Sequence, residues 1–341
     1  MSTTTPTRLT SREFRLAARP VGEPRLSDLE LVSTDVPELA DGQILVRNTW
    51  MSVDPYMRGR MDDVPSYIEP FALGKPLEGS ALGEVIASRA PQVPVGTTVT
   101  HFLGWREYAV LDSAEATVVD TALAPPQAYL GVLNITGLTA YLAVTEIAPV
   151  REGDVVLVSA AAGAVGSVAG QIARTRGASR VIGVAGGPRK VEKVVTDFGF
   201  DAAIDHRAGP IAAQLPEVAP DGIDVYVDHV GGEHLEAAIA AMRVGGRAAL
   251  VGAISEYNAT EPAPGPRNLY EAVKKRLTLR GLLVTAHLDM LDTWIPLAAG
   301  LLADGRLRTA ETSVDGLESA PEALIGVLRG ANIGKMLVRL A

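Results

Sequence analysis

The chain has 341 residues, enough for about two domains of ordinary size, and its 47% apolar and 21% charged residues are typical of a globular protein. With 40 acidic and 31 basic side chains the formal charge is -9, and the basic residues are scattered, so the basic patch needed for nucleic-acid binding is missing. The absence of cysteine excludes disulfides, thiolate nucleophiles and zinc sites that need sulfur.

The N-terminal segment, Met1 to Thr10, is polar and rich in threonine, and it lacks the apolar core of a signal peptide. No later stretch approaches the roughly 18 uninterrupted apolar residues that indicate a membrane span. The sequence therefore predicts a cytoplasmic protein that has no membrane partner.

The region from Glu13 to about Asp112 contains short alternating or β-branched runs that are separated by glycine and proline. Such runs, with little helical periodicity between them, predict a β-rich and partly closed domain. The expected strands are Glu13–Ala17, Leu29–Thr34, Gln43–Ser52, Ala81–Ser88 and Thr97–Leu103.

After Pro125 and Pro126, apolar strands alternate with helical patterns, which is typical of βαβ units in a doubly wound parallel sheet. The expected strands are Val155–Ser159, Arg180–Val184, Ala202–Asp205, Ile223–Asp228, Arg247–Gly252 and Leu277–Val284. A last strand, Lys335–Leu340, has no helix behind it and is assigned to the first domain. We expect a substrate domain made of residues 1–131 and 305–341 and a dinucleotide-binding domain made of residues 132–304.

A glycine-containing turn follows the first strand of the parallel sheet. In Ala160–Ser167, Ala161, Gly163 and Gly166 occupy the three places of the G-x-G-x-x-G fingerprint, with alanine at the first. Gly163 would let the backbone approach a pyrophosphate, and Gly166 would let the next helix pack close to the strand. Such turns also occur without ligands, but the strand–turn–helix context favours a dinucleotide with its pyrophosphate at the helix N-terminus.

The second strand of this sheet indicates which dinucleotide is bound. NAD sites carry an acid about 20 residues past the glycine loop, yet here the strand runs into Gly186 with no acid at its tip. Gly186 leaves room for a 2′-phosphate, and Arg189 or Lys190 can pair with it, so the sequence predicts NADP(H). In the alternative interpretation, both cations belong to a solvated helix start.

Several motifs in order resemble one family. They are Ser52–Gly59, Gly137–Tyr141, Ala160–Ser167, Phe198–Asp205, Ala253–Asn258 and Gly334–Met336. Together they resemble the zinc-independent medium-chain dehydrogenase/reductases of the leukotriene B4 dehydrogenase, prostaglandin reductase and 2-alkenal reductase branch, from about Phe14 to Leu340. The resemblance implies a GroES-like substrate domain around a Rossmann domain, a homodimer, and NADPH-dependent reduction of the C=C bond of an enone or enal substrate.

The resemblance also implies positions for the cofactor contacts of the family. They fall on Gly163, Ala164, Val165, Gly166, Lys190, Val251, Gly252, Ala253, Ile254, Ser255, Tyr257, Leu282, Leu283, Val284 and Asn332. The chain departs from the family pattern in three places. His206 stands where many relatives have a tyrosine near the adenosine, His229 replaces an asparagine, and Ile135-Thr136 replaces Met-Pro. We count His206 and His229 among the cofactor-binding residues.

Reduction of an enone by a nicotinamide requires a hydrogen-bond donor for the developing enolate oxygen. The first candidate is Tyr257, because it follows the fifth strand of the sheet at the edge where ligands bind, and the family's active-site tyrosine lies in this motif. Alternatively, Tyr257 only closes over the cofactor. Tyr56, just after Asp54-Pro55, is the second candidate, although packing is the more ordinary role for it.

Neither metal nor triad chemistry is indicated. The five histidines show no ligand spacing, and without cysteine a zinc alcohol-dehydrogenase site has no ligands. Ser167 begins a phosphate-binding helix and lacks a nucleophile elbow. The remaining alternatives are a reductase of quinones or of a dedicated biosynthetic enone, and a protein that binds NADP without turnover.

Overall fold

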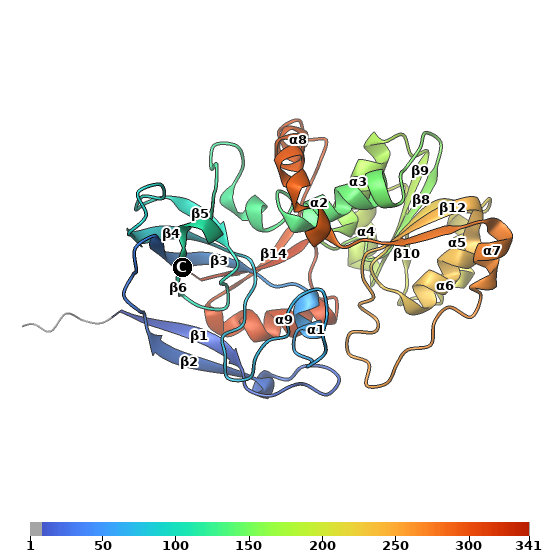
Figure 1. Ribbon diagram of the computed structural model, residues 1–341. Coiled ribbons are helices and arrows are strands. Elements are labelled where there is room, and N and C mark those ends of the chain that lie inside the picture. The colour runs from blue at the N-terminus through green and yellow to red at the C-terminus, as the bar shows by residue number, and fades with distance from the viewer. Residues whose placement is uncertain (1–8, 341) are drawn as a thin grey trace, which may run out of the picture. The chain divides into compact units, whose positions relative to one another are not determined.

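The computed structural model describes residues 9–340 (Figure 1). The expectation of an N-terminus without a signal peptide therefore rests mainly on residues 1–8, which lie outside the described residues. The described chain divides into two compact units, the first made of residues 9–130, 313–329 and 336–340 and the second of residues 131–312 and 330–335.

These limits differ from the expected ones at residue 131, at 305–312 and at 330–335, all of which belong to the second unit. Hydrogen bonds explain the difference. The side chain of Gln171 donates to the carbonyl of Arg308 (2.8 Å) and accepts from its amide (2.7 Å). The amide of Gly334 donates to the carbonyl of Ala162 (2.7 Å).

The second unit contains a six-stranded sheet in the order β10-β9-β8-β11-β12-β13, and all of its pairings are parallel. This order is that of a dinucleotide-binding sheet, and it confirms the predicted doubly wound fold. The strands are β8 (Val155–Val158), β9 (Arg180–Ala185), β10 (Ala202–Asp205), β11 (Ile223–Asp228), β12 (Met242–Leu250) and β13 (Thr278–Gly281).

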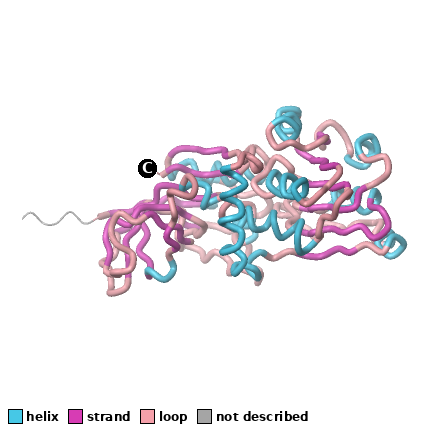
Figure 2. Tube along the Cα trace, turned by 90° about the horizontal axis from the view of Figure 1, so that it is seen from above, coloured by secondary structure: helices cyan, strands magenta, loops and turns pink. Residues whose placement is uncertain are grey.

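Helices cover both faces of this sheet. Helices α3 and α4 pack against β8, β9 and β10, while α5 and α6 contact each other and pack against β10 and β11 on the other side (Figure 1). In Figure 2 the strands of this unit run as aligned segments between helices. The helices are α2 (Ile135–Leu142), α3 (Gly166–Thr175), α4 (Pro188–Thr196), α5 (Ile211–Val218), α6 (Gly232–Ala241), α7 (Tyr270–Lys275) and α8 (Leu291–Ala303), with helical turns at Ala143–Ile147 and Val284–Met290.

Strand β12 begins five residues before the expected Arg247. The expected strand began only after the pair Gly245-Gly246. The strand instead continues through it, because Gly245 adopts a φ of 81° and the pairing with β11 shifts register there. A glycine is thus needed inside a strand, where it accommodates an irregularity.

The first unit is β-rich and incompletely closed, as predicted. Its main sheet has the order β14-β15-β3-β4-β5-β7, with β6 also paired to β3, and β1 and β2 form a separate antiparallel pair. The strands are β1 (Thr10–Leu16), β2 (Leu29–Asp35), β3 (Gln43–Ser52), β4 (Ala81–Ser88), β5 (Thr98–His101), β6 (Tyr108–Asp112), β7 (Thr117–Val118), β14 (Glu311–Asp315) and β15 (Lys335–Arg339). Its helices are α1 (Tyr56–Gly59) and α9 (Ala320–Leu328), with 3-10 turns at Leu26–Asp28, Ser113–Glu115, Pro126–Leu130 and Leu317–Ser319.

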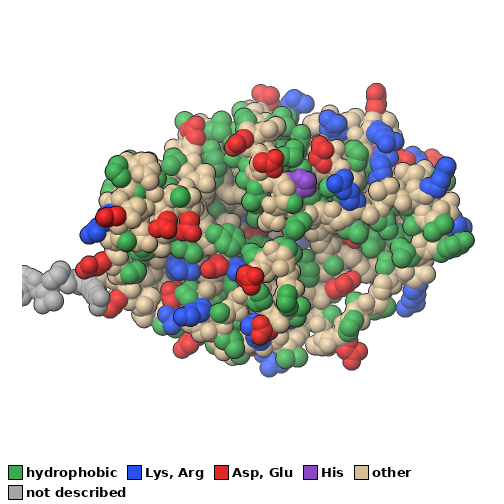
Figure 3. All heavy atoms as spheres, in the orientation of Figure 1, with side chains coloured by type: hydrophobic (Ala, Val, Ile, Leu, Met, Phe, Trp, Pro, Cys, Tyr) green, Lys and Arg blue, Asp and Glu red, His purple; other side chains and the backbone are tan. Residues whose placement is uncertain are grey.

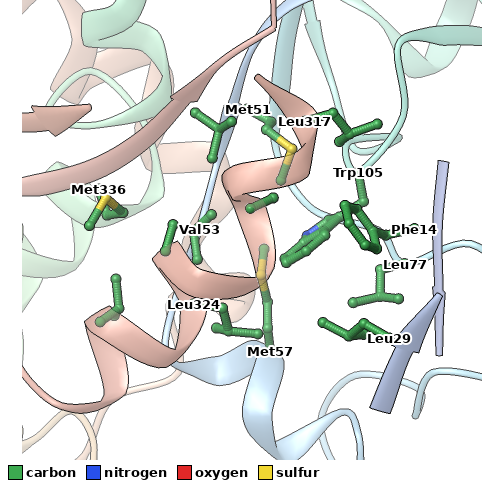
Figure 4. Close-up of a cluster of buried hydrophobic side chains, with 14 of the residues drawn as sticks. Phe14, Leu29, Met51, Val53, Met57, Leu77, Trp105, Leu317, Leu324 and Met336 are labelled. Atoms are coloured by element: carbon green, nitrogen blue, oxygen red, sulfur yellow. The ribbon is translucent and has the colours of Figure 1, made fainter. Parts of the chain in front are cut away.

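Residues from distant parts of the sequence form the core of the first unit (Figure 4). Phe14 and Trp105 meet edge to face with ring centroids 6.1 Å apart, and Leu324 of α9 belongs to the same cluster. This packing explains why the C-terminal segment completes a domain that begins at the N-terminus.

Acidic and basic side chains are interspersed on the face drawn in Figure 3. Across the described chain, no helix combines the length and the apolar character that a membrane crossing requires.

Candidate functional site

The predicted cofactor residues of the second unit gather at the carboxyl edge of its sheet. Five of the six parallel strands are followed directly by one of them, and β8 is followed by Gly163 at the end of a short turn. They are Gly163 to Gly166 after β8, Gly186 after β9, His206 after β10, His229 after β11, Val251 to Ser255 and Tyr257 after β12, and Leu282 to Val284 after β13. Ligands of open α/β sheets bind at this edge.

The turn after β8 is shaped by tight backbone contacts. Ala160 takes a left-handed φ of 47°, and its carbonyl accepts a hydrogen bond from the amide of Gly163 (2.8 Å). A Cβ on Gly166 would lie 2.5 Å from the same carbonyl oxygen, so only glycine fits there. Helix α3 begins at Gly166, and the positive end of its dipole at this turn favours an anion.

The segment 330–335 joins this edge from far along the chain. Besides the bond from Gly334 to Ala162, the Asn332 side chain donates to the Gly334 carbonyl (2.7 Å) and Lys190 Nζ donates to the Gly330 carbonyl (2.7 Å). Lys190 and Asn332, more than a hundred residues apart, are therefore fixed by one short segment of backbone.

Basic side chains surround Gly186. A Cβ on this residue would lie 2.7 Å from Nε2 of His206 and 2.9 Å from Nε of Arg207. Gly186 thus makes room for these two side chains, where the sequence suggested room for a phosphate alone. Burial and the neighbouring Arg207 lower the pKa of Lys190, and partial burial and Arg207 lower that of His206. Arg189, the other predicted phosphate partner, is exposed.

Sequence reasoning missed Arg207, although it lies two residues past the end of β10 at the ligand edge. The acid at the end of that strand, Asp205, has a structural task. Its Oδ1 accepts hydrogen bonds from the amides of Gly187 (2.8 Å) and Arg207 (2.9 Å). The bond from Gly187 is the main cause of the lowered pKa of Asp205. Asp205 therefore fixes the turn that carries Arg207 beside Gly186.

His229 is held in one protonation state at the end of β11. Its Nδ1 lies 2.9 Å from the carbonyl oxygen of Ser159, which can only accept, so Nδ1 carries the proton. Burial lowers the pKa of the ring, and its Nε2 is buried with no hydrogen-bond partner within residues 9–340. His229 is thus a neutral imidazole with one unused acceptor.

The turns after β11 and β12 are bonded to each other. The amides of Val251 and Gly252 donate to the Asp228 carbonyl (2.8 and 3.1 Å), and the Ile254 amide donates to the His229 carbonyl (3.2 Å). The Asp228 carboxylate accepts a hydrogen bond from the Tyr226 hydroxyl (2.8 Å). The turn that precedes Tyr257 is therefore rigidly attached to the sheet.

Tyr257 lies partly buried on this turn. Burial raises the pKa of its hydroxyl. A hydrogen bond from the backbone of Ala253 has the opposite but smaller effect. The phenol therefore stays protonated at neutral pH. Because an amide donor uses only a lone pair of the oxygen, the hydroxyl keeps its own proton for donation.

Tyr56 belongs to the first unit, where it begins α1. Its hydroxyl is buried and has no hydrogen-bond partner among the described residues, and it would lie 3.7 Å from a Cβ on Gly79. Burial, followed by the neighbouring Asp54, raises its pKa.

A small pocket lies beside the phosphate-binding turn within the second unit. It is lined by Gly131, Val132, Thr136, Ala164, Ser167, Val168, Thr309, Ala310, Glu311 and Lys335. The Thr136 hydroxyl in its wall donates to the Gly131 carbonyl (2.7 Å). The departure from the family pattern at Thr136 therefore changes the wall of a pocket next to the turn.

Two family models match the chain: one described as the N-terminal domain of oxidoreductase at residues 12–119 and one described as zinc-binding dehydrogenase at residues 164–300. Although the second description mentions zinc, the sequence has no cysteine. In the part of the chain that the structure describes, no three His, Asp or Glu side chains are grouped as metal ligands.

Curated relatives and a solved structure match nearly the whole chain. The NADPH-dependent curcumin reductase of Escherichia coli is 36% identical, with 97% of each chain covered, and the NADP(+)-dependent 2-alkenal reductase of Nicotiana tabacum is 36% identical, with 94% of each covered. The crystal structure of CurA from Vibrio vulnificus in complex with NADPH superposes with a TM-score of 0.92 at 38% identity, covering 97% of this chain and 99% of that one. The chain therefore belongs to the medium-chain dehydrogenase/reductase family, in the branch that includes the prostaglandin and 2-alkenal reductases.

Proposed function

We propose that the chain is an NADP-dependent oxidoreductase that reduces the activated C=C bond of α,β-unsaturated ketones or aldehydes. The observation that carries this proposal is the basic group of Lys190, His206 and Arg207 around Gly186, at the ligand edge of a dinucleotide-binding sheet. The activities named for the curcumin and 2-alkenal reductases supply the reaction class.

The residues present fit NADP(H). Lys190 and Arg207 give the charge that a 2′-phosphate needs. Strand β9 itself ends without an acid, and the nearby Asp205 carboxylate is bonded to the amides of Gly187 and Arg207. The N-terminus of α3, which begins at Gly166, favours the pyrophosphate through the helix dipole. When bound, NADPH supplies the hydride that reaches the β-carbon of the substrate.

In this proposal Tyr257 donates a hydrogen bond to the substrate oxygen on which negative charge develops. Its phenol is protonated, and its position is fixed by the turn bonded to β11. A donor held in place before the reaction costs no reorganisation, and this is the main source of such catalysis.

The function is tested by following NADPH absorbance with a panel of small enones, enals and quinones. We expect NADPH to be consumed with enones or enals, and NADH to support much slower turnover. Turnover with quinones alone would favour a quinone reductase. Tight NADPH binding in a thermal-shift assay without turnover on any compound would favour a binding protein, for which Thr136 and His229 are the notable departures.

The role of Tyr257 is tested with Tyr257→Phe. Removing one such donor should lower kcat about a hundredfold while the Kd for NADPH stays within about twofold. Tyr270→Phe is the matched control, because Tyr270 is 73% exposed on α7 and should leave kcat unchanged. Equal kcat for Tyr257→Phe and the wild type would leave only the loop-closing role for this side chain.

Further parts of the proposal concern the units and their assembly. We assign the cofactor and the Tyr257 contact with the substrate to the second unit, and the remaining substrate contacts to the first. A homodimer stays a prediction of the family resemblance, and a cytoplasmic location stays a prediction from the sequence. Light scattering of the purified chain tests the first, and fractionation of the native host tests the second.

A further inference from the structure

Two histidine rings lie in contact beside the proposed 2′-phosphate position. The rings of His206, which follows β10, and His234, in the first turn of α6, meet edge to face with centroids 5.4 Å apart. His206 remains exposed, with its Nε2 near Gly186 and Arg207. Nδ1 of His234 is buried and has no hydrogen-bond partner within the described residues.

Burial and the neighbouring charged groups keep the pair neutral in the free protein. Partial burial, Arg207 and Lys190 oppose a charge on His206, and only Asp205 favours one. Burial and then His206 lower the pKa of His234 to about 4, against the opposite effect of Asp228. Positive groups therefore dominate around His206, so a protonated His206 lacks a sufficient counter-charge.

We propose that the 2′-phosphate of NADPH supplies this counter-charge, so that cofactor binding is coupled to the uptake of a proton by His206. The inference rests on the proposed function and makes His206 a specificity-determining residue of this chain, where many relatives have a tyrosine. A tyrosine donates the same kind of hydrogen bond but does not become charged near neutral pH.

The direction of the pH effect follows from linkage. The free protein holds His206 neutral, and the dianion favours the imidazolium, so the complex binds more protons than its separate components. Affinity for NADPH therefore rises as the pH falls through the pKa of His206 in the complex. Because the second pKa of a phosphate monoester is about 6, the window from about pH 8 to pH 7 isolates the histidine from the phosphate itself.

His234 limits the pair to a single charge. Its ring touches that of His206, and each charge would disfavour the other. The T-shaped contact also orients the His206 ring, and a phenylalanine at position 234 would preserve the contact without a titrating group. His234 is thus a positioning residue, and the proton belongs on His206.

Isothermal titration calorimetry of the full-length protein, in two buffers with different ionisation enthalpies, counts the protons taken up. We expect uptake of about half a proton to one proton per NADPH at about pH 7.5, and a Kd that falls roughly three- to tenfold from pH 8 to pH 7. NADH, which lacks the 2′-phosphate, should be bound with close to no uptake. NADPH binding with no more uptake than NADH would overturn the inference alone, whereas no NADPH binding would overturn the proposed function as well.

Three variants locate the proton. His206→Tyr should keep NADPH binding and lose the uptake and the pH dependence, whereas His234→Phe should keep both. His287→Asn, outside the pair, is the control for removing any histidine and should match the wild type. Proton uptake that persists in His206→Tyr, or that is lost only in His234→Phe, would contradict the assignment. Circular dichroism checks that each variant folds. If His206→Tyr does not fold, His206→Asn takes its place.

Discussion

Replacing Lys190 with methionine removes one cation from the proposed phosphate position and keeps most of the aliphatic stem. Lys190 Nζ now donates to the Gly330 carbonyl at 2.7 Å, and both burial and Arg207 make its charge less favourable in the free protein. An incoming 2′-phosphate would relieve that unfavourable charge, so Lys190→Met should affect NADPH far more than NADH.

The size of the effect can be estimated from the contact that is lost. A hydrogen bond to a charged group contributes about 1.5–3 kcal/mol, which corresponds to a Kd for NADPH raised about 10- to 100-fold. Because Lys190 is already partly desolvated, the upper half of this range is expected. The Kd for NADH should change less than about threefold, since no charge pairs with Lys190 in that complex.

The assay is a fluorescence or calorimetric titration of wild type and variant with NADPH and with NADH. Lys193→Met is a matched control on the same helix, because Lys193 pairs with Asp197 (2.5 Å) and is not expected to contact the cofactor. An equal loss of affinity for both nucleotides, or the same loss in Lys193→Met, would refute the argument.

Three further predictions concern packing, pH and metal. Gly170→Ala should lower the urea midpoint by an amount equivalent to about 1–3 kcal/mol, because the added Cβ would overlap the buried Phe200 ring; Gly300→Ala on α8, where a Cβ meets nothing within 4 Å, should not be destabilised. Burial lowers the pKa of His101 to about 3, below its ordinary value of 6.5. The contribution of this neutral histidine to the free energy of unfolding is therefore complete above pH 6.5, and it declines by up to about 1.4 kcal/mol per pH unit as the pH falls toward 3. The gap in melting temperature between wild type and His101→Gln should therefore narrow on acidification, and a constant gap would contradict this. Dialysis against a strong chelator should leave NADPH turnover unchanged, and recovery of lost activity by added zinc would show that the proposed mechanism is incomplete.

Local sequence determined much of the second unit. Short, mainly apolar runs with turn residues at their ends predicted β10 and β11 with their observed limits. The phosphate-binding turn was also readable, since the close approach of Gly166 to the Ala160 carbonyl permits no side chain. The start of β12 could not be predicted, because a glycine pair has the same local pattern in a turn and in an irregular strand.

Only the tertiary structure decided how the site is completed. Arg207 became a candidate because the bonds of Asp205 to Gly187 and Arg207 bring the ends of β9 and β10 together, and no pattern along the chain encodes this. The segment 330–335 joined Lys190 through hydrogen bonds between residues about 140 positions apart. The contact of His206 with His234 likewise depends on strand order: the sequence determines which side chains stand at each strand end, but the order of the strands determines which ends are neighbours.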